Sequence, residues 1–216
     1  MLQVAYKTVG LLRENTYVVY NNLNDALIFD PGAQAETLIQ WIDENQWKPK
    51  AILLTHAHYD HIGALDELRD YYKISVYLHS LEKEFLIDPQ LNLSQFSNRD
   101  VIQRPADYYW ENDNLGEYQI EGFKIKILHT PGHSPGHVTY LFEEDLFMIS
   151  GDILFKGSVG RTDLLNANTN DLNQSIKNKL LILPPAYKVF PGHGEPTELS
   201  QEIENNLYLQ DIIEKS

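Results

Sequence analysis

Four side chains able to bind a metal ion occur within six residues of this chain, in the run Thr55-His56-Ala57-His58-Tyr59-Asp60-His61. His56 and His58, two residues apart in an extended turn, can bind one ion, and Asp60 and His61 can bind another. Imidazole nitrogens and carboxylate oxygens suit Zn²⁺, Fe²⁺ or Mn²⁺. The run therefore predicts a metal site rather than a capped turn with incidental histidines.

Three further segments place a His or an Asp beside a glycine, directly after a run of apolar residues. They are Thr130-Pro131-Gly132-His133, Gly151-Asp152 and Pro191-Gly192-His193-Gly194. Ligand sites gather at the carboxyl ends of strands in layered α/β proteins, and glycine lets the backbone turn tightly near a ligand. Each segment alone is a weak signal, but four such sites in one chain point to a common chemical purpose.

The elements that must position these residues alternate between strand and helix. Strands are predicted at residues 17–20, 26–29, 51–54, 74–78, 123–127, 146–149 and 187–190. Helices are predicted at residues 37–47, 62–72, 80–87 and 172–183, and from residue 197 onward. Residues 88–114 show no periodicity. They could form a lid or binding loop, or a surface segment packed by its own aromatic side chains.

Composition narrows the class of protein. The chain has 216 residues, of which 43% are hydrophobic, as in an ordinary globular protein. It has no run long enough to span a bilayer, no signal-peptide pattern and no Cys, so we expect a cytoplasmic protein without a membrane partner. The net charge is 17 − 31 = −14, with no basic cluster, which argues against nucleic acid as a partner. The oligomeric state is not predicted.

Taken in order over nearly the whole chain, the four motifs resemble the signature of the metallo-β-lactamase superfamily. The resemblance implies one domain over residues 1–216 with an α+β four-layer αββα sandwich fold, in which two mixed β-sheets pack face to face with helices outside. It implies two divalent metal ions, zinc first, with iron or manganese as alternatives. It assigns the first metal to His56, His58 and His133, the second to Asp60, His61 and His193, and both metals to Asp152.

A finer resemblance follows Asp152. Residues 151–164, which include Gly160-Arg161-Thr162-Asp163, are similar to the glyoxalase II-like branch, particularly its short single-domain bacterial members. The segment lines the substrate mouth in that branch, so Arg161, Thr162 and Asp163 are predicted to bind substrate. Asp163 stands where full-length glyoxalase II carries a Tyr. The resemblance implies a hydroxyacylglutathione hydrolase-like enzyme that cleaves a small thioester, such as S-lactoylglutathione or a related acyl-thiol.

Two neighbouring metal ions would polarise a carbonyl, lower the pKa of bound water to roughly 7 and stabilise the developing oxyanion. The resemblance makes a metal-bridged hydroxide the nucleophile, with Asp60 and Asp152 as catalytic residues. Only 216 − 193 = 23 residues follow His193, too few for the helical domain that grips glutathione in full-length glyoxalase II. We therefore expect loose substrate binding.

The remaining polar residues receive supporting roles. Metal-binding imidazoles anchor their second nitrogen to an outer acceptor, and Asp30, at the end of an early strand, is our candidate for that acceptor. A turn-capping role is the alternative for Asp30. His79 and His129 lie outside the motifs and are expected to pack, and His137 is given no role as a ligand.

Other functions on this fold stay open. A persulfide dioxygenase also carries a Gly-Arg-Thr-Asp run and would bind one iron through His56, His133 and Asp152, but the intact motif at His193 favours two metals. A lactonase is a second alternative, whereas the net charge argues against a nuclease. His58 argues against the electron-transferring diiron branch, which has Glu there. A non-catalytic metal-binding domain is the alternative of another class, against which the full set of seven ligands argues.

Overall fold

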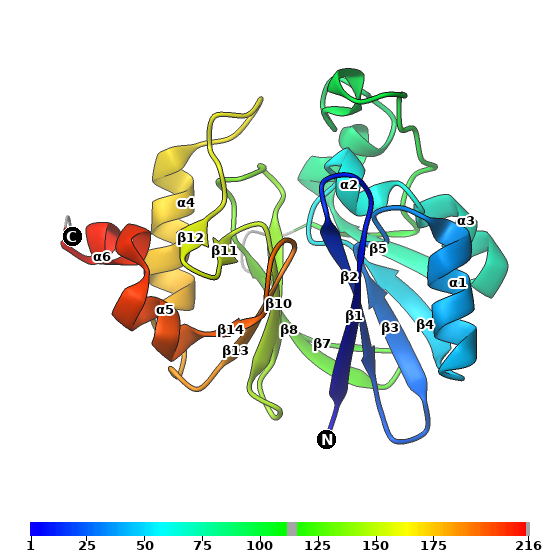
Figure 1. The fold of residues 1–216 in the computed structure, drawn as a ribbon, viewed down its shortest axis with the longest axis horizontal. Helices are drawn as coiled ribbons and strands as arrows, with labels where there is room; N and C mark the ends of the chain where they lie inside the picture. Colours follow the sequence, from blue (N-terminus) through cyan, green and yellow to red (C-terminus); the bar gives the residue numbers. More distant parts are fainter. Residues whose placement is uncertain (112–115, 215–216) are drawn as a thin grey trace. The chain divides into compact units, whose positions relative to one another are not determined.

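Two six-stranded β-sheets organise the computed structural model, which describes residues 1–111 and 116–214 (Figure 1). The chain divides into two compact units, Met1–Glu111 and Asn112–Ser216, and each unit contains one of these sheets. The prediction of a single domain over residues 1–216 stays a prediction.

The sheet of the N-terminal unit has the strand order β1-β2-β3-β4-β5-β6. The strands β1, β2 and β3 pair antiparallel, whereas β3, β4, β5 and β6 pair parallel. Parallel neighbours end at the same edge of a sheet, so the residues that follow β3, β4 and β5 come together there. The bounds are β1 (Gln3–Val9), β2 (Glu14–Tyr20), β3 (Asp25–Phe29), β4 (Lys48–Leu53), β5 (Ser75–His79) and β6 (Tyr108–Trp110).

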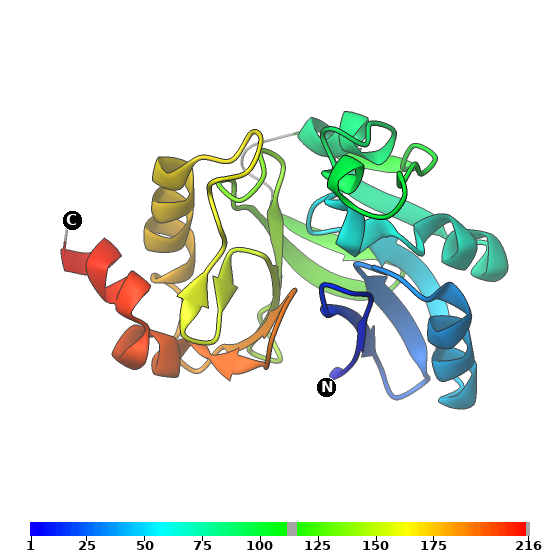
Figure 2. The ribbon, with the colours of Figure 1, turned by 45° about the horizontal axis from the view of Figure 1, so that its top comes forward.

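Helices α1 and α3 cover one face of this sheet (Figures 1 and 2). Their buried residues recur at helical spacing, Leu38 with Ile42 and Leu65 with Leu68, and they pack in one core with the strand residue Ile52. The helical segments of this unit are α1 (Ala35–Glu44), α2 (Tyr59–Ile62), α3 (Leu65–Tyr72) and the 3₁₀ turns η1 (Ser80–Leu86) and η2 (Ser94–Phe96).

The sheet of the C-terminal unit has the order β14-β13-β10-β9-β8-β7, in which only the pair β10 and β13 is parallel. Strand β8 is antiparallel to β9, and β9 to β10, so β8, β10 and β13 all end at the same edge. The bounds are β7 (Glu117–Ile120), β8 (Phe123–His129), β9 (Val138–Phe142), β10 (Phe147–Gly151), β13 (Lys188–Pro191) and β14 (Thr197–Glu198), with the small hairpin β11 (Leu154–Phe155) and β12 (Ser158–Val159).

Three helices pack on one face of the second sheet (Figure 1). Leu172, Leu199 and Leu209, one from each helix, share a core with Met148 and Val189 of the strands. The bounds are α4 (Thr169–Ser175), continued by one π turn, η3 (Ile176–Leu180), then α5 (Leu199–Asn205) and α6 (Leu207–Glu214). Within the described residues, no helix is long and apolar enough to cross a membrane.

All seven predicted strands are confirmed, with ends shifted by a few residues. The strands that the pattern missed include β1, β6 and β7, which lie at sheet edges and bury few of their side chains. The predicted helix at 62–72 is wrong as a single element, because the chain breaks at Gly63 between α2 and α3. The N–H of Ala64 donates to the carbonyl oxygen of Pro31 at 2.9 Å, so a contact with the turn after β3 accompanies the break.

Three other helix predictions need correction. Residues 80–86 form a 3₁₀ helix, the segment predicted at 172–183 begins at Thr169 and ends in a π turn, and Thr197 belongs to the short strand β14. Residues 88–114 contain η2 and β6 besides irregular chain, and residues 112–114 lie outside the described part.

Candidate metal centre

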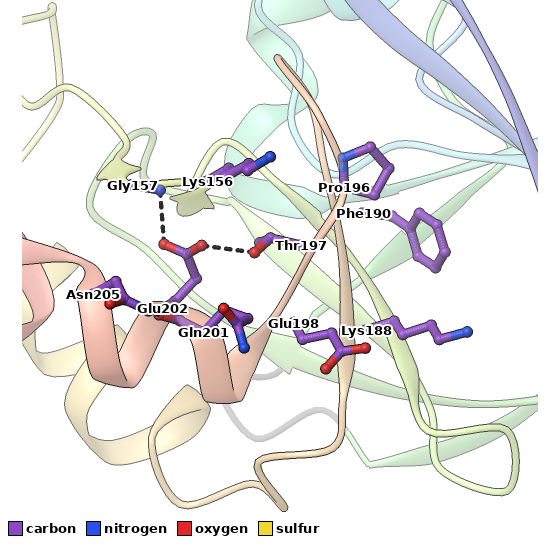
Figure 3. A pocket seen from close by; sticks show the side chains of 10 residues that line it. All are labelled: Lys156, Gly157, Lys188, Phe190, Pro196, Thr197, Glu198, Gln201, Glu202 and Asn205. Carbon is purple, nitrogen blue, oxygen red and sulfur yellow. Dashed lines mark hydrogen bonds between the residues drawn. The ribbon is translucent and has the colours of Figure 1, made fainter.

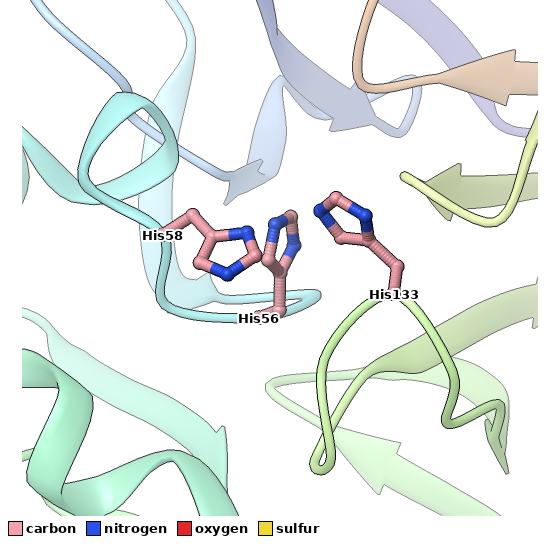
Figure 4. A group of neighbouring side chains, drawn as sticks. All are labelled: His56, His58 and His133. Atoms are coloured by element: carbon pink, nitrogen blue, oxygen red, sulfur yellow. The ribbon is translucent and has the colours of Figure 1, made fainter. Parts of the chain in front are cut away.

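The predicted ligands of the N-terminal unit follow β4 directly. His56 and His58 lie on the loop after β4 (Figure 4), and Asp60 and His61 lie in α2. The three histidines are buried, and the ring of His56 has its centroid 4.7 Å from that of His58 and 4.1 Å from that of His61. The structure therefore brings the predicted His cluster of this unit together.

Asp30, the residue after β3, anchors this cluster. Its Oδ1 accepts a hydrogen bond from the backbone N–H of Thr55 at 2.7 Å, and its Oδ2 accepts from the Thr55 hydroxyl at 2.6 Å. Nδ1 of His61 lies 3.1 Å from the same Oδ2. Parallel pairing of β3 and β4 brings the two strand ends side by side. The contact agrees with the predicted role of Asp30 as an outer acceptor for a metal-binding imidazole.

These contacts also determine which nitrogen of each ring carries a proton. The Thr55 hydroxyl has one proton and donates it to Asp30, so at 3.0 Å from Nδ1 of His56 it must accept from that nitrogen. His61 likewise donates from Nδ1, because its partner is a carboxylate. In both rings Nε2 is then the nitrogen suited to a metal ion.

The predicted ligands of the C-terminal unit follow β8, β10 and β13. His133 lies on the turn after β8 (Figure 4), Asp152 follows β10 and His193 follows β13. Oδ2 of Asp152 lies 3.5 Å from Nε2 of His133 and 3.5 Å from Nε2 of His193. Two ligand atoms that bind one tetrahedral metal at about 2.1 Å are separated by roughly 3.4 Å. Each of the two distances therefore fits a metal ion that is bound by Oδ2 of Asp152 and by Nε2 of that histidine.

The backbone directly after the β11–β12 hairpin fixes the orientation of His133. Its Nδ1 donates to the carbonyl oxygen of Arg161 at 2.9 Å, which again directs Nε2 toward the ligand position. Gly160, the preceding residue, is packed tightly: a Cβ there would lie 1.9 Å from the carbonyl oxygen of Asp152 and 3.3 Å from Cβ of His133. Glycine at 160 therefore lets the hairpin approach two predicted ligands at once.

The histidines that were not predicted as ligands are held by hydrogen bonds to the backbone and to Thr130. Nε2 of His137 accepts from the backbone N–H of Asp152 at 3.0 Å, so its Nδ1 donates to the hydroxyl of Thr130. Nδ1 of His79 accepts from the N–H of Leu81, and Nε2 of His129 donates to the carbonyl oxygen of Pro135. Each is buried and fixed by backbone contacts, which agrees with the structural roles expected for His79 and His129.

The family model described as the metallo-beta-lactamase superfamily matches residues 9–193, a range that includes all seven predicted ligands. This chain belongs to the metallo-β-lactamase superfamily. The family predicted from the sequence is confirmed, and with it the membership of a superfamily of metal-dependent hydrolases.

Two curated relatives of this superfamily match nearly end to end. The probable metallo-hydrolase YqgX of Bacillus subtilis is 46% identical over 202 residues, which cover 93% of this chain and 94% of the relative. The hydroxyacylglutathione hydrolase GloC of Haemophilus influenzae is 33% identical over 201 residues, which cover 93% of this chain and 95% of the relative.

Two solved structures share the fold. The crystal structure of the BLEG-1 B3 metallo-beta-lactamase matches with a TM-score of 0.92 and 44% identity, over 96% of this chain and 99% of that one. The structure of TTHA1623 in a di-iron-bound form matches with a TM-score of 0.84 and 36% identity, over 95% of this chain and 100% of that one. The predicted fold class, α+β with two mixed sheets and helices, is confirmed by these matches.

The three predicted substrate-binding residues of this superfamily member line one cavity of about 490 Å³ in the C-terminal unit. The Arg161 guanidinium donates to both carboxylate oxygens of Asp163, at 2.7 and 2.8 Å. These hydrogen bonds lower the pKa of Asp163 to about 2 and raise the pKa of Arg161. The hydroxyl of Thr162 lies 2.6 Å from that of Thr169. Arg161 therefore already holds one carboxylate, with which a substrate would compete.

A second cavity of the C-terminal unit, of about 630 Å³, contains none of the predicted site residues (Figure 3). Its buried carboxylate, Glu202, accepts hydrogen bonds from the N–H of Gly157 at 2.8 Å and from the hydroxyl of Thr197 at 2.7 Å. These contacts attach the hairpin of β11 and β12 to helix α5. Glu202 thus supports the hairpin that precedes Arg161, the residue whose carbonyl orients His133.

Sequence reasoning missed several residues that build the site. Thr55 sets the proton arrangement of His56, and only its place directly before the His run could have signalled this. Glu14 is buried, and burial raises its pKa well above the usual range. A Cβ on Gly32 would lie 2.3 Å from Oε2 of Glu14 and 1.9 Å from the carbonyl oxygen of Asp60, so glycine at 32 lets the chain pack between Glu14 and helix α2, which carries this predicted ligand.

Proposed function

We propose that this chain is a metal-dependent hydrolase that cleaves a small thioester, such as S-lactoylglutathione or a related acyl-thiol. The observation that carries the metal-dependent part is the position of Asp152, whose Oδ2 is 3.5 Å from Nε2 of both His133 and His193. The thioester part rests on the GloC relative, at 33% identity over nearly the full chain, and on the Arg161 cavity.

The donor set suits two divalent metal ions. Imidazole nitrogens and carboxylates are ligands of Zn²⁺, Fe²⁺ and Mn²⁺, and the Nδ1 atoms of three of the rings have hydrogen-bond partners that direct Nε2 to a metal. We propose zinc, and the di-iron relative makes iron the first alternative. The proposed ligands are His56, His58 and His133 for one ion, Asp60, His61 and His193 for the other, and Asp152 for both.

The reaction adds water to the thioester carbonyl and breaks the C–S bond, which gives a carboxylic acid and a thiol. Bound metals supply an activated water and a Lewis acid at the carbonyl oxygen. The side chain of Asp60 is 14% exposed, and its Oδ2 lies 3.8 Å from Nε2 of His61, so its carboxylate can take up the proton of water and return it to the leaving sulfur. Asp30, Thr55 and the Arg161 carbonyl hold the imidazoles in one orientation.

A β-lactam is the second candidate substrate. The BLEG-1 structure, a B3 metallo-beta-lactamase by its description, is 44% identical over nearly the whole chain, whereas the GloC relative is 33% identical. The same water chemistry would open a β-lactam amide instead of a thioester. What favours the thioester is the GloC relative, together with the resemblance of residues 151–164 to the glyoxalase II-like branch.

An assay of the metal-loaded protein against four substrates separates these functions. We expect metal-dependent thiol release from S-lactoylglutathione, little turnover of a chromogenic cephalosporin or a lactone, and no oxygen consumption with glutathione persulfide. Elemental analysis should give two metal ions per chain. A higher kcat/KM for the cephalosporin would make the protein a β-lactamase, and oxygen uptake with one iron per chain would make it a persulfide dioxygenase.

A further inference from the structure

A cavity of about 390 Å³ lies wholly within the N-terminal unit and is built from residues other than those of the Arg161 cavity. It brings the predicted ligand Asp60 together with apolar side chains of two segments, the turn between β1 and β2 and the stretch from η2 to Val101. The lining residues that matter here are Leu11, Leu12, Asp60, Phe96, Arg99 and Val101.

Large apolar side chains at this cavity are left open to water. Leu11 is 89% exposed and Phe96 is 80% exposed. Neighbouring exposed apolar groups around a hollow are typical of a binding site. Ligand pockets usually measure roughly 300 to 1,000 Å³, so this cavity has room for a small ligand.

Hydrogen bonds hold the segment that carries Phe96 in a fixed backbone conformation. Asn92 is fully buried, and its side-chain amide donates to the carbonyl oxygens of Phe85 and Val101, both at 2.8 Å. The backbone carbonyl oxygen of Asn92 accepts a hydrogen bond from the N–H of Tyr59 at 2.9 Å, which connects the segment to the residue before Asp60. A surface segment packed by its own aromatics would bury Phe96. The backbone is instead fixed beside a predicted ligand while the ring is presented outward.

Arg99 supplies the cation of this cavity. In the part of the chain that the structure describes, Arg99 has no ion pair, whereas Arg104 in the same segment pairs with Asp70 at 2.6 Å. A guanidinium can bind a carboxylate through two parallel hydrogen bonds, with a strength that a lysine does not match. The charge of Asp60 in the same cavity is offset when a metal is bound.

We propose that this cavity receives the acyl part of the substrate, and that this acyl part is an apolar chain ending in a carboxylate that Arg99 binds. The inference rests on the proposed thioester hydrolysis. Under the proposed function, Arg161 of the C-terminal unit binds a carboxylate of the thiol carrier. The cavity of the N-terminal unit includes the predicted ligand Asp60, which makes it our candidate for the acyl part, with Leu11, Leu12 and Phe96 against the acyl chain.

The test uses thioesters of one small thiol, N-acetylcysteamine, with succinic, adipic and suberic acids, each beside the primary amide that replaces its free carboxylate. For the best chain length we expect kcat/KM of the acid to exceed that of the amide by about tenfold or more, through KM. In Arg99→Gln this ratio should fall to about one, and Arg99→Lys should be intermediate. Lys83→Gln removes the same charge from an exposed residue outside the cavity and should keep the ratio.

Binding of the matching thioethers, which cannot be hydrolysed, is measured by calorimetry on the same variants. An Arg99-dependent preference for the acid thioether without any thioester cleavage would sustain the inference and refute the proposed function. Cleavage with no acid preference, or a preference that survives Arg99→Gln, would refute the inference and leave the function standing. If sedimentation shows a dimer that the Phe96→Ser substitution dissociates, a second copy of the chain covers the cavity. That result would also refute the inference.

Discussion

The backbone N–H of Asp152 donates a hydrogen bond of 3.0 Å to Nε2 of His137. Nε2 of His137 therefore acts as a hydrogen-bond acceptor, and Nδ1 contacts the hydroxyl of Thr130. This hydroxyl lies 3.0 Å from that of Thr139. All of these side chains are buried. A chain of hydrogen bonds thus runs from strand β9 to the backbone of the carboxylate that we propose binds both metals.

His137→Ala should weaken metal binding without unfolding the protein. Loss of an outer partner of a ligand typically costs 10- to 100-fold in metal affinity, and His137→Gln, which keeps an acceptor in place of Nε2, should recover much of it. The dissociation constant is measured by competition with a coloured chelator. His129→Gln, a buried His of the same segment that contacts Pro135, is the control and should bind metal normally. Normal affinity in His137→Ala would refute this role.

Asp152→Ala and His58→Ala should abolish hydrolysis while the fold is retained. Both side chains lie beyond strand ends, outside the two apolar cores, so the circular dichroism should be unchanged. Elemental analysis should find fewer than two metals per chain, and the melting temperature should fall somewhat because bound metal stabilises the folded state. The control is His79→Gln, another buried His. Near wild-type turnover in either alanine variant would contradict the ligand assignment.

Gly160→Ala should damage the site through backbone displacement. The added Cβ would lie 1.9 Å from the carbonyl oxygen of Asp152, and neither backbone can yield cheaply. Overpacking of this kind costs roughly 1–3 kcal/mol, or a fall in melting temperature of about 2–12 °C for a chain of this size. Metal affinity should fall with it. Gly116→Ala, which would meet nothing within 4 Å, is the control. A stable Gly160→Ala variant that binds metal normally would show that the hairpin can shift freely.

The placement of the candidate ligands after strand ends was predictable because these strands carry a clear apolar pattern. His56, Asp152 and His193 each come directly after such a strand, and β8, β10 and β13 end at one edge because of their pairing, so the C-terminal ligands meet. Asp30 could be predicted for the same reason. The sequence resemblance then named the family, which the match to residues 9–193 confirms.

What the sequence could not predict depends on contacts between distant residues. The proton arrangement of His133 is set by the carbonyl of Arg161, and any residue type supplies a carbonyl. The pairing of Arg161 with Asp163 depends on side-chain rotamers, and sequence reasoning assigned both residues to the substrate. The exposure of Phe96 depends on the buried amide of Asn92, which no periodic pattern reveals. Edge strands such as β1 were not predicted from the apolar pattern, because few of their side chains are buried.

Competition for the Arg161 guanidinium gives a prediction about substrate binding. Arg161→Ala should raise KM for an anionic thioester and leave kcat largely unchanged, because a contact made equally in the ground and transition states affects KM alone. The carbonyl that orients His133 belongs to the backbone and survives this substitution. Asp163→Asn should act in the opposite direction, since it frees the guanidinium. An exposed ion pair is weak, so KM should fall by only about two- to fivefold.

The pH dependence of this competition follows from the pKa of Asp163. The pKa is lowered to about 2, so the pair is fully formed above the ordinary value of 3.8 and is lost only as the pH falls through about 2. The effect of Asp163→Asn on KM should therefore be constant between pH 5 and pH 9. The control is Glu195→Gln, which breaks the exposed pair with Lys156 and should leave KM unchanged. If KM does not fall in Asp163→Asn, or falls at one end of this range only, Asp163 does not compete with the substrate for Arg161.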